Sequence, residues 1–347
     1  MGAEPVAELG GDWNQLKSES LDGLVDLTAL GPWLDERGLA PGRPLEATRI
    51  SGGMSNESIG LTRGGERWVL RRPARVALDG ADRGMRREFR LLSAIQDTGL
   101  PVPRVHALCT DPQVIGAVFY VMDFVDGFTG IGEPPRPFAE EAGVRREASL
   151  SCMHALGHLH SVDWRACGLE DFGRPSGFHE RQVGRWLKQL DATQGREHPG
   201  LRDVGAWLDA NRPSDGTWTP TIMHGDYHSG NVMLALDAPG RVAAILDWEN
   251  ATIGDPLLDL GGFLRLWGTS ERASWCDEAR MIDAWCERSG LEVSDLRYYK
   301  ALSAFKLSVM LEGIYQRSNT DASRGSGHAM GDMAAKLAAE ARTIVDA

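Results

Sequence analysis

Residues 222–247 hold two aspartates and an asparagine at a spacing that suits phosphoryl transfer. Asp226 precedes a short loop, Asn231 follows five positions later, and Asp247 ends an apolar run. Moving a metal-bound phosphoryl group requires a carboxylate that orients the attacking hydroxyl, and an amide and a second carboxylate that hold Mg²⁺ against nucleotide phosphates. The three residues match these three tasks. Because Asp, Asn and Gly are also common in turns and helix caps, the surrounding elements must decide between the two interpretations.

A loop and a β-hairpin are predicted around these residues. Apolar runs at 232–236 and 242–246 flank the turn sequence Ala-Pro-Gly at 238–240. Such a hairpin would place the two aspartates and the asparagine at neighbouring strand ends. Apolar strands beside polar loop residues favour a functional site over an ordinary surface turn.

Three further strands are predicted upstream, at 45–50, 58–63 and 67–72, and a small-residue loop joins the first two. Glycines in this loop let backbone N–H groups approach an anion, and its serine and asparagine side chains add donors. The loop could therefore cover nucleotide phosphates, although it has neither a Walker lysine nor Gly-x-Gly-x-x-Gly. The residues assigned to this contact are Ser51, Gly52, Gly53, Ser55 and Asn56.

A helix predicted at about 82–96 carries Glu88 on its apolar face. The apolar residues three, four or seven positions from it are Met85, Leu91, Leu92 and Ile95. A buried carboxylate without a cationic partner is costly, and the preceding strand offers Arg71, with Arg72 as the alternative. A strand cation paired with a helix glutamate holds the α- and β-phosphates in kinases. A surface position for Glu88 is the competing interpretation.

The strand predicted at 118–125 looks like a hinge between two lobes. Backbone groups near its end would meet the adenine edge, and the methionine would border the pocket. The residues assigned to this contact are Met122, Asp123, Phe124 and Val125.

A Gly- and Pro-rich connector at 127–137 follows the hinge and suggests a domain boundary near residue 127. We expect an N-terminal extension and helix at 1–40, a nucleotide-binding lobe at 41–127, and a catalytic and substrate-binding lobe at 128–347.

The second lobe is predicted to be mostly helical, with Trp186 and Trp207 in its core and a polar loop at 318–331. Asp255 precedes Pro256 and is predicted to cap a helix, so a structural role is expected for it and for Asp259. His154 and His158 share a helix face, but no acidic or cysteine ligand accompanies them, which disfavours a metal site there.

Composition limits the classes of function. With 347 residues, 42% apolar and 25% charged, the chain can build two lobes with real cores. It has no apolar run of membrane-spanning length and no signal-peptide pattern at its start, so we expect a cytoplasmic protein without a membrane partner. Its five cysteines form no Cys-x2-Cys pair and are expected to be reduced. The net charge of −12 argues against nucleic acid as the main partner.

In order along the chain, these motifs resemble the aminoglycoside phosphotransferase and choline kinase family, whose fold is similar to that of protein kinases. The most specific parts are His224-Gly-Asp226-x4-Asn231 and Asp247-Trp-Glu249, and the resemblance covers nearly all of the chain after residue 40. Segments 69–73 and 299–317 look like the branch that is fused to, or encoded beside, acyl-CoA dehydrogenases. An arginine stands where many relatives carry the strand lysine, and Glu312 stands where that branch tends to show glutamine.

This resemblance implies a bilobal α+β fold, with an antiparallel sheet plus helix in the N-lobe and a mostly helical C-lobe. It implies transfer of the ATP γ-phosphate to a hydroxyl of a small molecule. Asp226 would be the catalytic base, His224 would brace its loop, and Asn231 and Asp247 would hold Mg²⁺.

The acceptor is open at this stage. The resemblance to the branch that is fused to, or encoded beside, acyl-CoA dehydrogenases favours a hydroxy acid or its CoA thioester. Lys306 or Arg317 could meet the negative charge of such an acceptor. An aminoglycoside or other antibiotic is the alternative acceptor, and a nucleotide-binding pseudokinase with a regulatory role is the alternative of another class. GTP in place of ATP, and a monomer or a homodimer, are equally compatible with the sequence.

Overall fold

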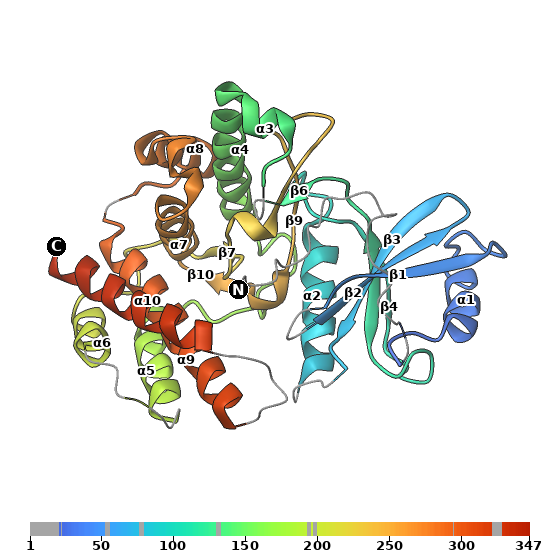
Figure 1. Cartoon of the computed structure of the whole chain (residues 1–347), viewed down its shortest axis with the longest axis horizontal. Helices are drawn as coiled ribbons and strands as arrows, with labels where there is room; N and C mark the ends of the chain where they lie inside the picture. Colours follow the sequence, from blue (N-terminus) through green and yellow to red (C-terminus); the bar gives the residue numbers. More distant parts are fainter. Residues whose placement is uncertain are drawn as a thin grey trace. The chain divides into compact units, whose positions relative to one another are not determined.

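The structure is a computed structural model that describes residues 21, 23–52, 56–75, 80–129, 133–192, 196, 200–293, 295–320 and 328–347 (Figure 1). Two compact units interleave along the sequence. The first unit comprises Met1–Ala155, Arg165–Leu169 and Ser229–Ala251, and the second comprises Leu156–Trp164, Glu170–His228 and Thr252–Ala347. The domain boundary expected near residue 127 stays a prediction.

A five-stranded antiparallel sheet forms the centre of the first unit, in the order β1-β2-β3-β5-β4. Its strands are β1 (Leu45–Gly52), β2 (Asn56–Arg63), β3 (Glu66–Pro73), β4 (Val105–Cys109) and β5 (Phe119–Asp123). The four strands predicted from apolar patterning are confirmed. Sequence reasoning missed β4, an edge strand that follows two prolines and alternates poorly between apolar and polar residues.

Helices cover the two faces of this sheet. Helix α1 (Leu27–Asp35) packs with Trp33 against a buried cluster that includes Leu61 and Phe119. The helix runs through Gly31 and Pro32, and the Asp26 side chain caps its first turn at the Thr28 N–H. Helix α2 (Ala81–Ile95) packs on the other face, against β3, β4 and β5, and confirms the helix predicted there (Figure 1).

The first unit also contains the predicted hairpin. Strand β8 (Val232–Leu234) pairs antiparallel with β9 (Val242–Ile245), and β6 (Phe128–Thr129) completes a three-stranded sheet in the order β6-β8-β9. Short 3₁₀ turns, η2 (Ser229–Asn231) and η3 (Trp248–Asn250), flank the hairpin. Helix α3 (Arg136–Glu140) follows β6, and α4 (Ala142–Ser161) is divided between the two units.

The second unit is built mainly of helices around one small sheet, as predicted. Strand β7 (Thr221–Met223) pairs with β10 (Thr252–Gly254), and α9 packs against α10, α7, α5 and α6. The remaining elements are α5 (Phe178–Ala192), α6 (Leu201–Ala210), α7 (Leu257–Gly268), η4 (Glu271–Ser274), α8 (Glu278–Ser289), α9 (Arg297–Thr320) and α10 (His328–Asp346). Within the described residues, none of these helices has both the length and the apolar character required to cross a membrane.

Two expectations for this unit were wrong in part. The loop predicted at 318–331 is helical at both described ends, because α9 continues to Thr320 and α10 begins at His328, while 321–327 lie outside the described residues. Trp186 is buried, as predicted. Trp207 is only half-buried, because its ring lies at the surface, with Arg297 Cζ 5.1 Å from the ring centroid.

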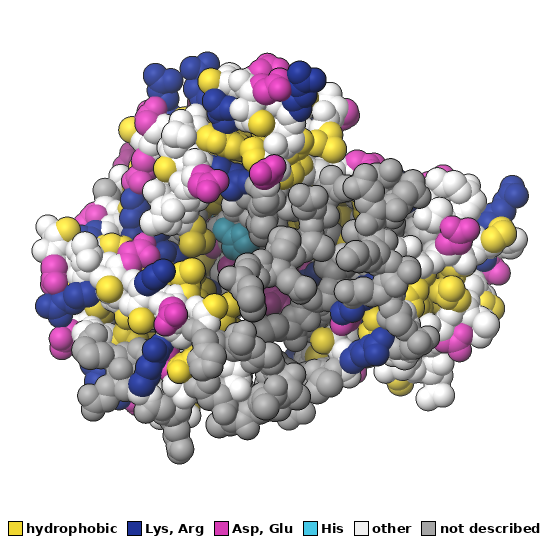
Figure 2. Space-filling view, viewed as in Figure 1, with side chains coloured by type: hydrophobic (Ala, Val, Ile, Leu, Met, Phe, Trp, Pro, Cys, Tyr) yellow, Lys and Arg dark blue, Asp and Glu magenta, His cyan; other side chains and the backbone are white. Residues whose placement is uncertain are grey.

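Charged side chains of both signs share the described surface. On the face drawn in Figure 2, basic and acidic side chains alternate over short distances rather than gathering by sign. This mixture matches a composition of 37 Lys and Arg against 49 Asp and Glu. The local arrangement of charges at the candidate site is therefore more informative than the net charge.

Candidate active site

The alternation of β3 separates the two candidate cations. Arg71 points into a pocket of the first unit, whereas Arg72 points to the opposite face of the sheet. The Arg72 guanidinium donates to the backbone carbonyls of Leu24 and Pro73, the latter at 3.1 Å. Arg71 is therefore the partner of Glu88, and the choice left open by the sequence is settled.

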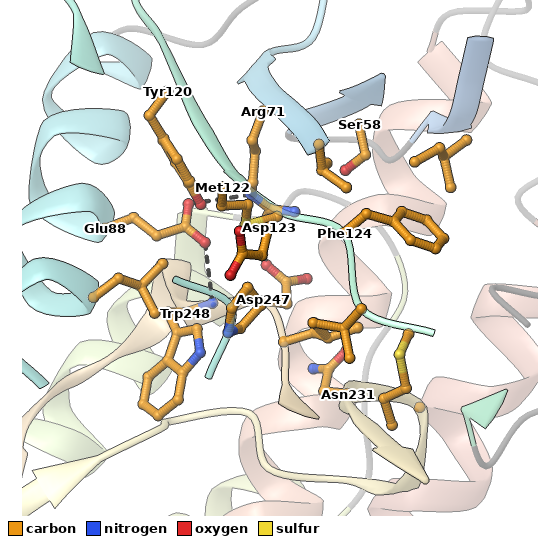
Figure 3. A pocket seen from close by; sticks show the side chains of 18 residues that line it. Ser58, Arg71, Glu88, Tyr120, Met122, Asp123, Phe124, Asn231, Asp247 and Trp248 are labelled. Atoms are coloured by element: carbon orange, nitrogen blue, oxygen red, sulfur yellow. Dashed lines mark hydrogen bonds and ion pairs between the residues drawn. The ribbon is translucent and has the colours of Figure 1, made fainter. Parts of the chain in front are cut away.

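Glu88 is buried, with 2% of its surface exposed, which confirms its inward orientation. Its Oε2 accepts from Arg71 Nε at 3.2 Å, and its Oε1 accepts from the Trp248 backbone N–H at 3.2 Å (Figure 3). Arg71 Nη2 also lies 2.5 Å from Asp247 Oδ1. Burial lowers the pKa of Arg71, but Glu88, Tyr120 and Asp247 outweigh it, so the pKa lies well above its usual value. The guanidinium therefore stays charged.

We expect Glu88→Ala to destabilise the protein by about 3–5 kcal/mol, because it leaves the Arg71 charge without its buried partner. Chemical denaturation followed by circular dichroism measures the change. Glu140→Ala is the matched control: its partner Arg136 is exposed, and such pairs contribute about 0–1 kcal/mol. A loss for Glu88→Ala no larger than that of the control would show that the buried pair contributes little.

The pocket that receives Arg71 is formed entirely by residues of the first unit. Its wall includes the four residues predicted at the hinge, Met122 to Val125. The Asp123 carboxylate is bound by His106 Nε2 at 2.6 Å, which directs that side chain toward His106. Among the described residues, the Val125 backbone N–H has no hydrogen-bond partner. The apolar residues that line the pocket are Ile50, Val69, Leu92, Pro103, Met122, Phe124, Val125, Met233, Leu246 and Trp248.

Asn231 and Asp247 line the same pocket (Figure 3). The Asn231 carbonyl accepts from the Leu246 N–H at 2.8 Å, which ties η2 to the end of β9 and holds the two residues on connected backbone. Asp247 has φ +63°, a left-handed conformation that is uncommon for residues other than glycine and concentrates at functional sites. An amide oxygen, a carboxylate, phosphate oxygens and water are the ligand set that Mg²⁺ prefers, so these residues fit a magnesium ion.

The small-residue loop is described at its two ends. Ser51 and Gly52 end β1 and pair with the start of β2. Asn56 begins β2, and its Nδ2 donates to Glu249 Oε2 at 2.8 Å, so this amide contacts a carboxylate that follows the hairpin. The other two predicted loop contacts, Gly53 and Ser55, lie outside the described residues. A phosphate contact by this loop stays a prediction.

The loop after β7, in the second unit, contains His224, Gly225 and Asp226. The His224 and Gly225 backbone N–H groups donate to the two carboxylate oxygens of Asp259, at 2.6 and 2.9 Å. The His224 ring is fully buried, and its Nδ1 accepts from the Asp226 N–H at 3.3 Å. These contacts are those of a histidine that braces the loop. The two N–H groups also compensate the buried Asp259 carboxylate.

The Asp226 side chain is half-exposed and lies near several positive or polar groups. His228 Nε2 lies 3.6 Å from Asp226 Oδ2. Burial raises the pKa of Asp226, but the hydrogen bond and charge of His228, together with Lys306 and His224, outweigh it. The pKa is therefore below its usual value, and the carboxylate is ionised near neutral pH. An ionised carboxylate at this position can accept a proton.

Asp255 has the structural role that the sequence suggested. Its Oδ1 accepts from the Leu257 N–H at 3.0 Å, at the start of α7. Its Oδ2 accepts from His179 Nε2 at 2.9 Å and from the Tyr299 hydroxyl at 2.7 Å, and all of these groups are buried. These contacts account for the whole carboxylate of Asp255.

Sequence reasoning missed two polar contributors to the pocket. Ser58 faces it from β2, and Tyr120 faces it from β5, two positions before the predicted hinge methionine. The Tyr120 hydroxyl is buried and lies beside the Glu88 carboxylate. Burial and the nearby Glu88 raise its pKa, so the hydroxyl stays protonated. The period of two along a strand was the available signal for Tyr120, because alternate residues share a face.

Comparison with known proteins shows the family to which the chain belongs. A family model described as "Phosphotransferase enzyme family" matches residues 46–295, more than half of the chain. The chain belongs to the phosphotransferase enzyme family. Acyl-CoA dehydrogenase family member 11 of Gallus gallus is 32% identical to this phosphotransferase over 321 residues, which are 86% of this chain and 40% of that protein. Acyl-CoA dehydrogenase family member 10 of Mus musculus is 30% identical over 295 residues, 80% of this chain and 27% of that protein. The phosphotransferase therefore spans less than half the length of these relatives.

Solved structures share the fold of this phosphotransferase. A Ralstonia eutropha structure named as an aminoglycoside phosphotransferase is 29% identical, covers 92% of this chain and 98% of its own, and has a TM-score of 0.80. The aminoglycoside phosphotransferase APH(4)-Ia, solved with AMP-PNP and hygromycin B, is 14% identical. The match covers 91% of this chain and 98% of that chain, with a TM-score of 0.59. The resemblance stated from the sequence and the kinase-like α+β fold are both confirmed.

Proposed function

We propose that this phosphotransferase is an ATP- and Mg²⁺-dependent kinase of small molecules that phosphorylates a hydroxyl group. The observation that carries the proposal is the pocket of the first unit. One cavity there is lined by the Arg71–Glu88 pair, by an apolar wall whose Val125 N–H has no partner among the described residues, and by Asn231 and Asp247, whose side-chain oxygens could bind a metal.

Each part of the pocket has a task in holding the nucleotide. The Val125 N–H would meet an acceptor nitrogen of the purine, and the apolar wall would contact the faces of the ring. Arg71, held by Glu88, would meet the α- and β-phosphates. Asn231 and Asp247 would hold Mg²⁺, which neutralises charge on the phosphate oxygens when bound. Solved relatives with this fold bind AMP-PNP or GDP, which supports a nucleotide in this pocket.

In the proposed transfer, the bond between the γ-phosphorus and the β–γ bridging oxygen breaks, and a bond forms from phosphorus to the substrate oxygen. The hydroxyl proton passes to Asp226, and ADP leaves. The spacing of five residues between Asp226 and Asn231, together with the ionised state of Asp226, supports this role. His224 and Asp259 support it indirectly, because they hold the backbone of the loop.

For the acceptor, we favour a hydroxy acid or its CoA thioester. Support comes from the relatives named as acyl-CoA dehydrogenase family members, which match this chain over most of its length. The competing acceptor is an aminoglycoside, which the name of the Ralstonia eutropha structure suggests and which relatives solved with kanamycin or hygromycin B bind.

A coupled ADP-release screen tests these choices. The panel contains hydroxy acids, their CoA thioesters, amino alcohols and kanamycin, each with Mg·ATP, and ³¹P NMR identifies the phosphorylated product. We expect ADP release to depend on a hydroxy acid or a thioester. Stimulation by kanamycin alone would favour the antibiotic kinase. Binding of ATP with no acceptor-dependent ADP would favour the pseudokinase, and no binding of ATP by calorimetry would reject the nucleotide site itself.

A further inference from the structure

Lys306, on α9, contacts the loop that carries Asp226. Its Nζ donates to the Gly225 carbonyl at 3.0 Å, within the second unit. Gly225 has φ +82°, a conformation that suits glycine and turns the chain just before the aspartate. The N–H of the same glycine donates to Asp259 at 2.9 Å. A carboxylate from α7 and an ammonium from α9 thus hold the two polar backbone groups of one residue.

The charges around Lys306 come from three elements: the loop after β7, α7 and α5. Burial lowers the pKa of Lys306, Asp226 and Asp259 raise it, and Arg185 of α5 lowers it, with a net shift below the usual value. The ammonium also lies 5.8 Å from the ring centroid of Trp186, within the range of a cation–π contact. The ammonium is partly buried, and removing a charge from water is costly unless it is paired and hydrogen-bonded. The groups that compensate it here are the Gly225 carbonyl and the carboxylates of Asp226 and Asp259.

We propose that Lys306 is a positioning residue for the transfer, which fixes the Gly225 carbonyl and presents its positive charge to Asp226. The proposal rests on the proposed function, in which Asp226 accepts the hydroxyl proton. In this proposal Lys306 does not bind a negatively charged acceptor. The contact that the structure shows joins Lys306 to the Gly225 carbonyl, in the loop that carries Asp226.

Rigidity of this loop matters because proton transfer depends strongly on geometry. A displacement of about 1 Å can reduce a rate on the order of 10²-fold, even when the altered residue does not touch the substrate. Asp226 follows Gly225 directly, so rotation of the Gly225 peptide would reorient the aspartate. The Lys306 contact restrains that rotation from the carbonyl side, and Asp259 restrains the loop from the N–H side.

The test compares Lys306→Met with Lys306→Arg in the full chain, with Mg·ATP and the acceptor found in the screen. We expect the kcat of Lys306→Met to be about 10- to 100-fold lower than that of wild type. The KM values for ATP and for the acceptor should change less than about twofold. Lys306→Arg keeps a charged donor and should recover most of kcat. Lys300→Met is the control on the same helix, because Lys300 pairs with Glu278 at 2.7 Å and should keep wild-type kcat.

Two outcomes would overturn the proposal in an active enzyme. One is a Lys306→Met variant with wild-type kcat. The other is a raised KM for the acceptor with unchanged kcat, which would make Lys306 an acceptor-binding residue.

A second measurement does not depend on turnover. The unfolding free energies of wild type, Lys306→Met, Asp226→Asn and the double variant form a cycle that isolates the coupling between the two side chains. We expect the two substitutions to be non-additive. If wild type released no ADP with any acceptor, the proposed function would fail, but this cycle would still test whether Lys306 acts on Asp226. Additive effects would then reject the proposed link between the two residues.

Discussion

Asp226→Asn is expected to reduce kcat on the order of 10²- to 10⁴-fold, the range typical for removal of a general base. Asparagine has nearly the shape of aspartate but cannot take up the hydroxyl proton. The half-exposed side chain is not part of a core, so the fold and the melting temperature should change little. Because Asp226 is not among the residues that line the proposed nucleotide pocket, affinity for Mg·AMP-PNP should be retained.

Steady-state ADP release with the acceptor from the screen measures this effect, and calorimetry with Mg·AMP-PNP provides the affinity. Asp237→Asn is the matched control, because Asp237 is an exposed aspartate in the turn of the hairpin. Its kcat should equal that of wild type. If Asp226→Asn turned over as fast as the control, another group would have to accept the proton.

Asp247→Asn is expected to abolish the contribution of Mg²⁺ to nucleotide binding and to lower kcat on the order of 10³-fold, since a bound metal supplies several kcal/mol of transition-state stabilisation. Asparagine suits this position because, like aspartate, it tolerates the left-handed backbone with φ +63°. Arg71 loses one of its two carboxylate partners but keeps Glu88. The folded structure should therefore persist.

Calorimetry with AMP-PNP, with and without Mg²⁺, isolates the effect of the metal. Wild type should bind more tightly when Mg²⁺ is present, and Asp247→Asn should show the same affinity in both conditions. Asp97→Asn is the control in the first unit, where Asp97 forms an exposed pair with Arg104. Mg²⁺-dependent binding that persisted in Asp247→Asn would remove this residue from the metal site.

Local patterning predicted the elements that position the pocket. The helical period placed Glu88 on the face of its apolar neighbours, and that residue is 2% exposed. Two apolar runs joined by an Ala-Pro-Gly turn predicted the hairpin of β8 and β9. These predictions succeeded because a helix or a hairpin is formed by residues near one another in sequence, so its pattern is contained within the segment.

Patterning failed where packing outweighs local preference. β4 was missed because a short edge strand shows little alternation, and pairing with β5 supplies its structure. The polar stretch after 318 was expected to be a loop, but part of it is helical, because α9 and α10 pack extensively against each other. Packing of an amphipathic helix can extend it into residues of weak helical propensity.

The sequence by itself determined which residue types were present for phosphoryl transfer, their order, and which residues of one helix or strand share a face. Only the tertiary structure decided that Arg71, and not Arg72, meets Glu88, and that the same guanidinium reaches Asp247, 176 positions away. It also decided that Lys306 holds the loop of Asp226. The physical reason is that these contacts join segments distant in the chain, so they follow from how the elements pack, which the period of a single segment does not contain.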